Sequence, residues 1–435
     1  MAPNVNPSDA ATLLGWLVRR SQAFLFKPLQ RESGWTWVLE ENDEQVRASI
    51  HAKGKYVGAL GFRHRWPSYR HSIIDSRFVA LAIEGSPEQK TSQAFRNPLQ
   101  QLALEIGKRL IQLESRLDDL LKHLFPRDKD GRVEWAASPL GGLKPAAPVS
   151  DKQVAIKLGH IPCGLRCSFC TRSIWPEDGF PDVFFLHSIL YRVATSLAQA
   201  PNGEGKIVIG SGEPSRFPDL VSIVRLARLR GYNSIAMESA AVGSLTAQRI
   251  SELASSGLTE VDLPLYGATD AVHDAVVGAP GHLQSIDWAV NEFSRAGVRV
   301  RMHGIPLTTN LKELEEIPVW TFNRGVDFHS FNFPLNQGES RIPLQELTPR
   351  LSDLPETIRP LLNLTIPCLG IGKTDSGPFA KIDSIELVDH EGRQVSESYQ
   401  MEFASVCASC RARPQCSGVF KGYLDIHGEG EFRAL

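Results

Sequence analysis

The sequence predicts an α/β protein with a partial (βα)6 TIM-like barrel, an N-terminal α+β domain and a small C-terminal cysteine-rich domain. Three observations support this organisation. Short apolar strands alternate with helical segments between residues 151 and 335. A stretch rich in proline, glycine and alanine, residues 137–150, has the composition of a linker. The seven cysteines lie in two groups, and the second group is near the C-terminus.

Six apolar segments of the middle part have the length and composition of buried strands. They are residues 154–158, 206–209, 234–237, 260–265, 298–302 and 327–331. Helical segments near 218–229, 246–256, 282–296 and 311–323 each have a glycine within two residues of their end. Strands that alternate with helices form a parallel sheet with the helices outside it. Six strands are fewer than a closed barrel needs, so we expect a partial barrel over residues 151–335 that binds ligands at the carboxyl ends of its strands.

The N-terminal domain, residues 1–136, has a different pattern. Segments 35–39, 46–50, 56–62 and 78–83 have strand composition, and apolar residues at helical spacing predict a helix over residues 99–125. This domain contains no cysteine and no motif that assigns it a role. Residues 336–435 form the C-terminal domain that carries the second group of cysteines.

The composition is that of a globular protein and excludes some classes of function. Hydrophobic residues make up 42% and charged residues 22% of the 435 residues. The formal net charge of −2 indicates no broad basic surface for nucleic acid or for an anionic membrane. No apolar run has the length of a membrane span, and residues 1–20 lack the pattern of a signal peptide. We therefore expect a cytoplasmic protein with no nucleic-acid or membrane partner.

The cysteines are better explained as metal ligands than as disulfides. Their number is odd, so a set of disulfides would leave one cysteine over. In a reducing compartment, clustered cysteines more often bind metal. Cys163, Cys167 and Cys170 have the spacing C-x3-C-x2-C and follow the predicted strand 154–158. Three thiolates can hold three corners of one cubane iron–sulfur cluster, which leaves one iron open for a group that is not protein.

This cysteine pattern, with Phe169 directly before the last cysteine, resembles the signature of the radical S-adenosylmethionine (radical SAM) superfamily. The resemblance implies a [4Fe–4S] cluster whose open iron holds the amino and carboxylate groups of SAM. The partial barrel is also the core fold of that family. The expected ligands of this cluster are Cys163, Cys167 and Cys170.

A second motif supports the resemblance. The four residues after the predicted strand 206–209 and Gly210 resemble the Gly-Gly-Glu-Pro loop with which that family binds the methionyl amine of SAM. They are Ser211, Gly212, Glu213 and Pro214, so serine replaces the first glycine. Glu213 would offer its carboxylate to the ammonium group in a charge-assisted pair. Considered alone, the loop would fit an ordinary strand-to-helix turn equally well.

The resemblance also implies further contacts with SAM. Phe169 would pack near the adenine ring, and Glu238 or Ser239 could bond the ribose hydroxyls. Residues 303–305, at the end of the fifth strand, lie where that family places the adenine ring. The predicted cofactor-binding residues are therefore Phe169, Ser211, Gly212, Glu213, Pro214, Glu238, Ser239 and Ile305.

The second group of cysteines has two explanations from spacing alone. Cys407, Cys410 and Cys416 form the pattern C-x2-C-x5-C, and Cys368 lies upstream. Four thiolates could hold a structural zinc ion or a second [4Fe–4S] cluster. The pattern resembles part of the SPASM domain that follows many radical SAM barrels, and the cysteine count is that of a twitch domain with one auxiliary cluster. If Cys368 is instead a buried core cysteine, the cluster would have an iron open to substrate.

The resemblance implies a reaction type. A radical SAM enzyme reductively cleaves SAM to a 5′-deoxyadenosyl radical that abstracts hydrogen from a substrate. The separate N-terminal domain favours a bulky substrate, a ribosomal precursor peptide modified by a thioether or carbon–carbon bond. A dehydrogenase or rearrangement enzyme acting on a small molecule is the alternative, and a non-catalytic zinc or iron–sulfur interaction protein is the rival of a different class. Ferredoxin or flavodoxin would donate the electron, and the sequence assigns no further catalytic residue.

Overall fold

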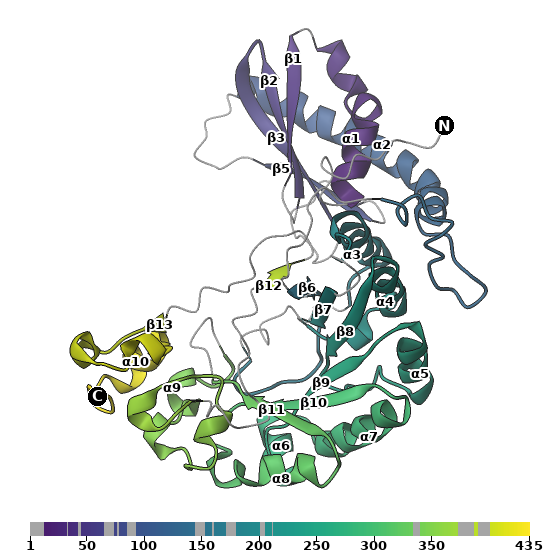
Figure 1. Ribbon diagram of the computed structural model, residues 1–435. Helices are drawn as coiled ribbons and strands as arrows, with labels where there is room; N and C mark the ends of the chain where they lie inside the picture. The colour runs from purple at the N-terminus through teal and green to yellow at the C-terminus, as the bar shows by residue number, and fades with distance from the viewer. Residues whose placement is uncertain are drawn as a thin grey trace. The chain divides into compact units, whose positions relative to one another are not determined.

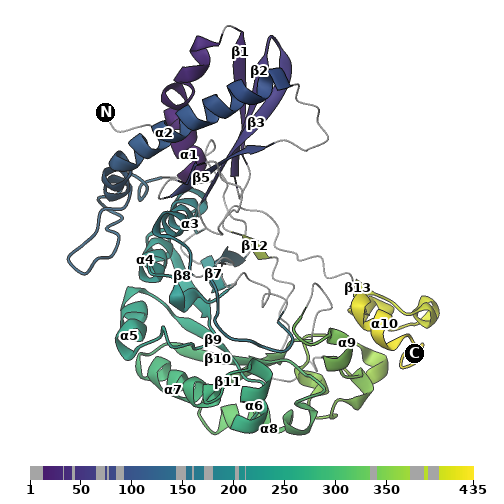
Figure 2. The ribbon, with the colours of Figure 1, turned by 180° about the vertical axis from the view of Figure 1, so that it is seen from behind.

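The structure, a computed structural model, divides the chain into two compact units. Unit 1 comprises residues 1–148 and 176–199, and unit 2 comprises residues 149–175 and 200–435. Figure 1 and Figure 2 show them from opposite sides. The described residues are 13–32, 34–41, 45–64, 74–75, 78–84, 93–143, 153–158, 161–170, 180–200, 205–210, 212–333, 340–372, 387–389 and 401–435.

Unit 1 is built on an antiparallel sheet with the strand order β1-β2-β3-β5-β4. The strands are β1 (Trp35–Glu41), β2 (Gln45–Ala52), β3 (Lys55–His64), β4 (Ile74–Asp75) and β5 (Val79–Glu84). Helices α1 (Leu13–Leu25) and α2 (Gln93–Leu124) lie on one face of this sheet, as the two opposite views show. The predicted strands and the long helix are confirmed, whereas α1 was not predicted.

A third helix of unit 1, α3 (Val183–Ser196), comes from the chain after the first strand of unit 2 and was also not predicted. The Asp182 carboxylate caps it by accepting a hydrogen bond from the Phe185 amide at 2.8 Å. Its Phe184 and Phe185 rings pack on His64, with centroids 5.4 and 5.0 Å from the imidazole. A helix encoded between two strands of unit 2 therefore belongs to the core of unit 1.

The predicted linker, residues 137–150, is described only as far as Leu143. In this part Leu140 is fully buried, and the Ser138 hydroxyl donates to the Leu124 carbonyl at 2.6 Å. The first half of the stretch thus packs against the end of α2. The domain boundaries drawn from the sequence remain predictions.

Unit 2 contains a parallel sheet with the order β11-β10-β9-β8-β7-β6-β12. The strands are β6 (Gln153–Lys157), β7 (Gly205–Gly210), β8 (Tyr232–Glu238), β9 (Glu260–Pro264), β10 (Arg299–Gly304), β11 (Asp327–Phe331) and β12 (Leu387–Asp389). The six predicted strands and their parallel arrangement are confirmed, and the partial barrel with them. The short strand β12 was not predicted and extends the sheet beside β6.

Helices cover the outer face of this sheet, as Figure 1 shows. They are α4 (Leu220–Leu229), α5 (Ala247–Ser256), α7 (His282–Arg295) and α8 (Glu316–Phe322), which confirms the four predicted helical segments. Local signals set their ends. The Thr246 hydroxyl caps α5 by accepting from the Arg249 amide at 3.1 Å, and Gly257 ends α5 in the left-handed region with φ of 116°.

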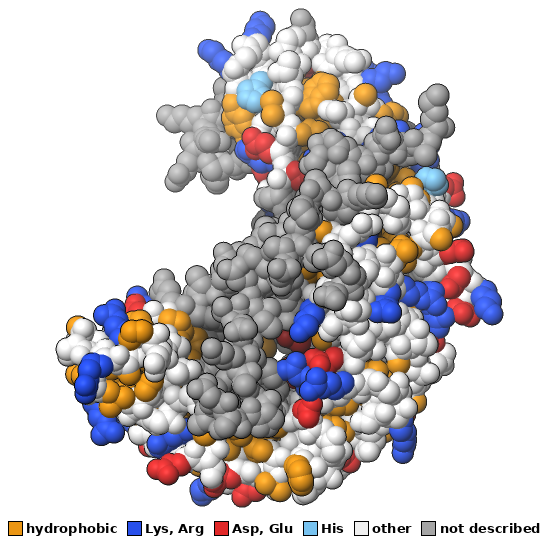
Figure 3. Space-filling model, viewed as in Figure 1, with side chains coloured by type: hydrophobic (Ala, Val, Ile, Leu, Met, Phe, Trp, Pro, Cys, Tyr) orange, Lys and Arg blue, Asp and Glu red, His pale blue; other side chains and the backbone are white. Residues whose placement is uncertain are grey.

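Side chains of β9 and β10 alternate between the two faces of the sheet. The buried positions are Val261, Leu263, Val300 and Met302. The opposite positions carry charged side chains that pair across the strands, Arg301 with Glu260 and His303 with Asp262, each at 2.8 Å. Figure 3 shows acidic and basic side chains next to one another on the surface of unit 2. The inner face of the partial barrel is therefore polar.

The remaining elements are short. Helix α6 (Asp270–Val277) lies between β9 and α7 and was not predicted. The C-terminal part has α9 (Leu344–Leu347), α10 (Lys421–His427) and an antiparallel pair of β13 (Met401–Glu402) and β14 (Val419–Phe420). No helix in the described part of the chain is long and apolar enough to cross a membrane. The 3-10 helices are η2 (Lys27–Arg31), η4 (Pro214–Arg216), η5 (Leu311–Glu313), η6 (Leu351–Asp353), η7 (Arg359–Leu361), η8 (Pro367–Leu369), η9 (Ser405–Ser409) and η10 (Arg413–Gln415).

Gly212, in the turn after β7, makes the closest backbone approach at the carboxyl end of the sheet. It has φ of 73°, and a Cβ atom there would lie 2.4 Å from the Ile161 carbonyl oxygen and 2.6 Å from that of Leu158. The next amide, that of Glu213, donates to the Ile161 carbonyl at 3.0 Å. Only glycine fits this position without moving the segment that leads from β6 into the cysteine loop.

We expect Gly212→Ala to destabilise unit 2. A left-handed conformation costs a residue other than glycine about 1–2 kcal/mol, and the clash with backbone oxygens adds to it. The thermal unfolding midpoint of unit 2 should therefore fall by at least about 2 °C. Gly430→Ala is the matched control, since a Cβ atom there would contact nothing within 4 Å. Equal midpoints for the two variants in calorimetry would show that the turn tolerates a side chain.

Candidate functional site

The three cysteines of the first group lie on one loop at the carboxyl end of β6. The end of α6 supports this loop, because the Arg166 amide donates to the Val277 carbonyl at 3.1 Å and the Ser168 amide donates to the Val276 carbonyl at 2.9 Å. All three cysteines are partly buried. Burial, and then the neighbouring thiols of Cys163 and Cys170, raise the pKa of Cys167 to about 12. Three converging thiols fit the three protein ligands of a cubane cluster.

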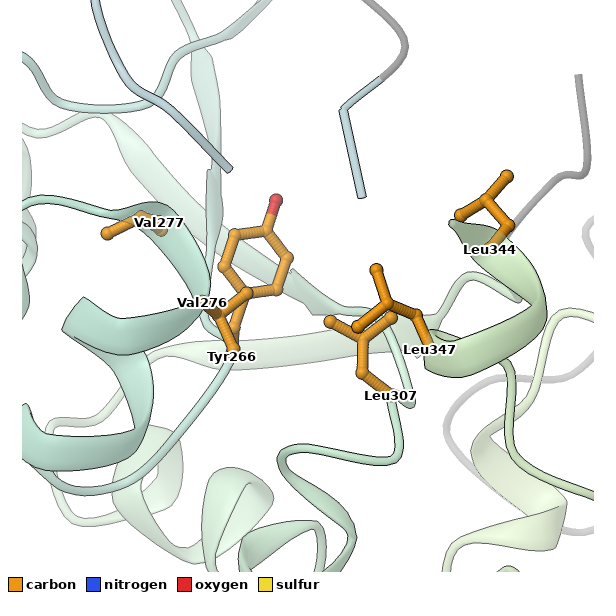
Figure 4. Packing of buried hydrophobic residues seen from close by; sticks show 6 residues of the cluster. All are labelled: Tyr266, Val276, Val277, Leu307, Leu344 and Leu347. Carbon is orange, nitrogen blue, oxygen red and sulfur yellow. The ribbon is translucent and has the colours of Figure 1, made fainter. Parts of the chain in front are cut away.

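An apolar cluster lies against the cysteine loop. It consists of Tyr266, Val276, Val277, Leu307, Leu344 and Leu347. Figure 4 shows Tyr266 between the two valines of α6 on one side and Leu307 and Leu347 on the other. Cys167, Phe169 and Ile305 pack against this cluster, and the Phe169 ring meets Tyr266 edge-on at a centroid distance of 5.1 Å. Phe169 and Ile305, both predicted near adenine, thus share one apolar environment.

Glu213 is fully buried, and its carboxylate has protein donors on both oxygens. Oε1 accepts from the Ser215 amide at 3.1 Å and from the Ser239 hydroxyl at 2.7 Å, while Oε2 accepts from the Ala240 amide at 2.7 Å. Burial raises the pKa of Glu213, and these hydrogen bonds oppose that shift. Because a carboxylate oxygen can accept two hydrogen bonds, Oε2 keeps a position for one further donor.

The other residues of the second motif surround Glu213. Gly212 forms the close turn, and Pro214 begins η4. Ser211 lies outside the described residues. Arg216 was not predicted as a functional residue. Its Nη1 donates to the Pro162 carbonyl at 2.7 Å, and this bond links η4 to the start of the cysteine loop. An arginine two residues after a proline carries no signal that would have marked it.

The predicted ribose-binding pair lies at the end of β8. The Ser239 hydroxyl donates to Glu213, so its single proton is already used. The Glu238 carboxylate lies over Gly210, where a Cβ atom would come within 2.2 Å of Oε2. Glu238 is in register with Asp262 of β9, on the polar inner face. The structure brings Ser239 to Glu213, and the contact of either residue with ribose stays a prediction.

Two further polar side chains lie at and after the carboxyl end of β10: His303, from the segment 303–305 that was predicted near the adenine ring, and Asn310, which was not predicted as functional. Burial alone would lower the pKa of His303, but the Asp262 carboxylate, 2.8 Å from Nδ1, raises it above its ordinary value. Asn310 is 1% exposed, and its Nδ2 donates to the carbonyls of Tyr266 and Ile305 at 2.8 and 2.9 Å. Asn310 thereby joins the loops after β9 and β10. No sequence pattern distinguishes Asn310 from an ordinary polar loop residue.

A cavity of about 440 Å³ lies against the cysteine loop. Its walls are formed by Cys163, Gly164, Leu165 and Arg216, by residues 241–244 after β8, and by the connection between α6 and α7. Of the residues predicted to bind cofactor or metal, Cys163 is the one that lines it. The cavity therefore adjoins the cluster loop but does not coincide with the predicted SAM contacts.

The second group of cysteines also converges. Cys368, Cys407, Cys410 and Cys416 line one hollow in the C-terminal part. Burial, and then the thiols of the other three, raise the pKa of Cys407. Among the described residues, no three Cys, His, Asp or Glu side chains are close enough to hold a single metal ion. A cubane cluster does not require such closeness, because each of its irons takes one thiolate, and four thiols around a hollow fit one cluster.

Comparison with known proteins agrees with the cysteine motif. The radical SAM superfamily matches residues 162–317. The chain is also 31% identical over 137 residues to a PqqA peptide cyclase of Rhodopseudomonas palustris. This alignment covers 31% of this chain and 34% of that relative. The chain thus spans about a third of the length of the curated relative that it matches.

Solved structures show weaker likenesses. SuiB of Streptococcus suis bound to its precursor peptide SuiA aligns with a TM-score of 0.36 and 15% identity over 57% of this chain and 48% of that chain. The enzyme anSMEcpe with bound AdoMet aligns with a TM-score of 0.35 and 16% identity over 46% of this chain and 56% of that chain.

The match to the superfamily includes the three cysteines, the Glu213 loop and most of the parallel sheet. It implies SAM and a [4Fe–4S] cluster as cofactors, and Cys163, Cys167 and Cys170 fit the family's motif. The predicted family is confirmed, and an enzyme is favoured over the non-catalytic interaction protein. Residues 162–317 are therefore a domain of the radical SAM superfamily.

Proposed function

We propose that this chain cleaves SAM reductively and uses the resulting radical to modify a ribosomal peptide, by forming a thioether or carbon–carbon bond. When bound, the cluster and SAM supply a one-electron cleavage that yields methionine and a 5′-deoxyadenosyl radical, which takes a hydrogen atom from the substrate. The observation that carries the proposal is the cysteine loop with Glu213 beside it. The Glu213 amide donates to the Ile161 carbonyl at 3.0 Å, two residues before Cys163, so the second motif is bonded directly to the cysteine loop.

The chain's own residues would bind and orient the cofactor. Cys163, Cys167 and Cys170 would each ligate one iron as thiolates. Oε2 of Glu213 would accept from the ammonium group of SAM at the acceptor position that the Ala240 amide leaves open. Phe169 and Ile305, on the apolar cluster, would contact the adenine ring. Glu238 or Ser239 would bond the ribose.

The similarity to a PqqA peptide cyclase supports a peptide as the substrate. The inner face of the partial barrel also fits a peptide, because it presents paired charges, Arg301 with Glu260 and His303 with Asp262, to a polar backbone. Unit 1 would bind part of a precursor peptide. No observation in the structure favours a small-molecule substrate over a peptide.

The four C-terminal cysteines would hold one auxiliary [4Fe–4S] cluster of the SPASM or twitch type. Two backbone amides already point at their sulfurs, since Gly418 donates to Cys416 Sγ at 3.4 Å and Leu435 donates to Cys410 Sγ at 3.5 Å. Such bonds stabilise thiolates and tune the potential of a bound cluster. The cluster would accept the electron that remains when the substrate radical is oxidised, or would bind the substrate.

The organisation and surroundings of the enzyme complete the proposal. We propose residues 1–136 as the N-terminal domain, 137–150 as the linker, 151–335 as the radical SAM barrel and 336–435 as the auxiliary-cluster domain. The exception is α3 (Val183–Ser196), which packs in unit 1. Ferredoxin or flavodoxin would supply the electron. Because thiolate clusters of this kind persist in reducing compartments, we place the protein in the cytoplasm.

Replacing Cys163, Cys167 and Cys170 together with alanine should remove the site of SAM cleavage. Anaerobic reconstitution of the wild type should give about eight irons per chain if both sites hold [4Fe–4S] clusters. The triple variant should keep about half of that iron and form no 5′-deoxyadenosine with SAM and dithionite. Formation of 5′-deoxyadenosine by the triple variant, measured by chromatography, would refute the assignment of these cysteines.

Glu213→Gln should weaken SAM binding while both clusters remain. A charge-assisted hydrogen bond is worth about 1.5–3 kcal/mol, so the SAM dissociation constant should rise roughly 10- to 150-fold. Glu313→Gln is the matched control, because the Glu313 carboxylate also accepts from two backbone amides and one hydroxyl, those of Ala268 and Thr269, but is not among the predicted SAM contacts. Equilibrium dialysis with labelled SAM measures both. Wild-type affinity in Glu213→Gln would mean that the carboxylate only supports the turn.

Replacing Cys407 and Cys410 with alanine should separate SAM cleavage from product formation. At most two of the four thiolates remain, too few for a stable cube, whereas the barrel cluster keeps its own ligands. SAM cleavage should therefore continue, and product from a peptide substrate should disappear. Metal analysis of the purified protein is the second measurement. If the wild type contains stoichiometric zinc and the double variant has lost it, these cysteines form a structural zinc site and do not hold an auxiliary cluster.

A further inference from the structure

A pair of buried histidines lies next to the proposed SAM site, and the steps derived above do not use it. His273 on α6 is 0% exposed, and His282 at the start of α7 is 5% exposed. Nε2 of His273 lies 2.9 Å from Nδ1 of His282, and the two ring planes differ by 8°. The two rings therefore share one direct hydrogen bond in the interior of unit 2.

The neighbours of the pair determine where each ring carries its proton. The Tyr266 amide can only donate, and it lies 3.2 Å from Nδ1 of His273, so this nitrogen accepts. Nε2 of His273 then carries the proton and donates to Nδ1 of His282. Nε2 of His282 donates in turn to the Ala240 carbonyl at 2.7 Å, because a carbonyl can only accept. All four ring nitrogens have partners, and each ring has one defined tautomer.

Both rings are neutral in this arrangement. Burial, and then the proximity of His282, lower the pKa of His273 to about 4, and burial lowers the pKa of His282. The hydrogen-bonded chain therefore has a fixed direction, from the Tyr266 amide through both imidazoles to the Ala240 carbonyl.

One end of this series of hydrogen bonds lies at the cysteine loop, and the other end lies at Glu213. At one end, Tyr266 packs against Phe169 of the cysteine loop, and His273 belongs to α6, whose last carbonyls hold that loop. At the other end, the Ala240 carbonyl belongs to the residue whose amide donates to Oε2 of Glu213 at 2.7 Å. The pair thus connects the support of the cluster ligands with the support of the Glu213 carboxylate.

We propose that His273 and His282 are positioning residues, which hold the Ser239–Ala240 backbone so that the Glu213 carboxylate keeps its place relative to the cysteine loop. The pair then sets the affinity for SAM through Glu213. This inference rests on the proposed function, since it takes Glu213 as the partner of the SAM ammonium group.

The test compares three variants of the reconstituted protein, with SAM as the probe. His282→Phe keeps a ring but removes both nitrogens, whereas His282→Gln restores an amide donor that can reach the Ala240 carbonyl. The control is His64→Phe in unit 1, where another buried histidine packs on Phe184 and Phe185. Iron content, thermal midpoint and the SAM dissociation constant are measured for each.

We expect unchanged iron in all three variants. The SAM dissociation constant should rise roughly 3- to 10-fold in His282→Phe, because ordinary hydrogen bonds are lost. It should return close to the wild-type value in His282→Gln. His64→Phe should lower the thermal midpoint without changing SAM affinity. Wild-type SAM affinity in a folded His282→Phe protein would overturn the inference, and so would His282→Gln binding as weakly as His282→Phe.

A further variant keeps the test decisive if His282→Phe does not fold. His282→Asn retains an acceptor for His273, but its shorter amide does not reach the Ala240 carbonyl. The inference predicts tighter SAM binding by His282→Gln than by His282→Asn, and equal affinities would contradict it. If the wild type itself binds no SAM, the proposed function fails, and this result is distinct from equal binding by wild type and variants.

Discussion

The structure of the site depends on one constraint, which is that three thiols must converge from a loop that has no regular structure of its own. Residues 161–170 contain no helix or strand, so contacts with other segments fix their course. The end of α6 accepts from two amides of this loop. Arg216 donates to the Pro162 carbonyl, and the Glu213 amide, next to Gly212, donates to the Ile161 carbonyl. The segments that follow the strands thus fix the positions of the three cysteines, and the parallel sheet fixes the positions of those segments.

The same loops carry the groups that would bind SAM, and this arrangement couples cofactor binding to the backbone. Glu213 is buried with three protein donors, so its position depends on the segment at Ser239 and Ala240. That segment is bonded through His282 and His273 to the residues beneath the cysteine loop. A carboxylate with fixed donors is oriented before its ligand arrives, which reduces the cost of ordering it on binding.

The sequence allowed the parallel sheet, its six strands and both cysteine groups to be predicted, because periodicity and spacing are local signals. It did not reveal α6, although α6 supports the cysteine loop, since a two-turn helix after a strand has little periodicity to detect. Nor did it reveal that α3 belongs to unit 1, because packing partners are not encoded in local pattern. Arg216, Asn310 and the two histidines were missed for the same reason: their roles arise from tertiary contacts that bring distant segments together.

The central claim is that SAM binds at the open iron of a cluster held by the first three cysteines. Electron paramagnetic resonance of the dithionite-reduced, reconstituted protein tests it most directly, before and after addition of SAM. The account predicts signals from two reduced clusters, of which one changes its g-values when SAM is added while the other is unaffected. Spectra that are identical with and without SAM, although the barrel cluster is present and reduced, would contradict the account.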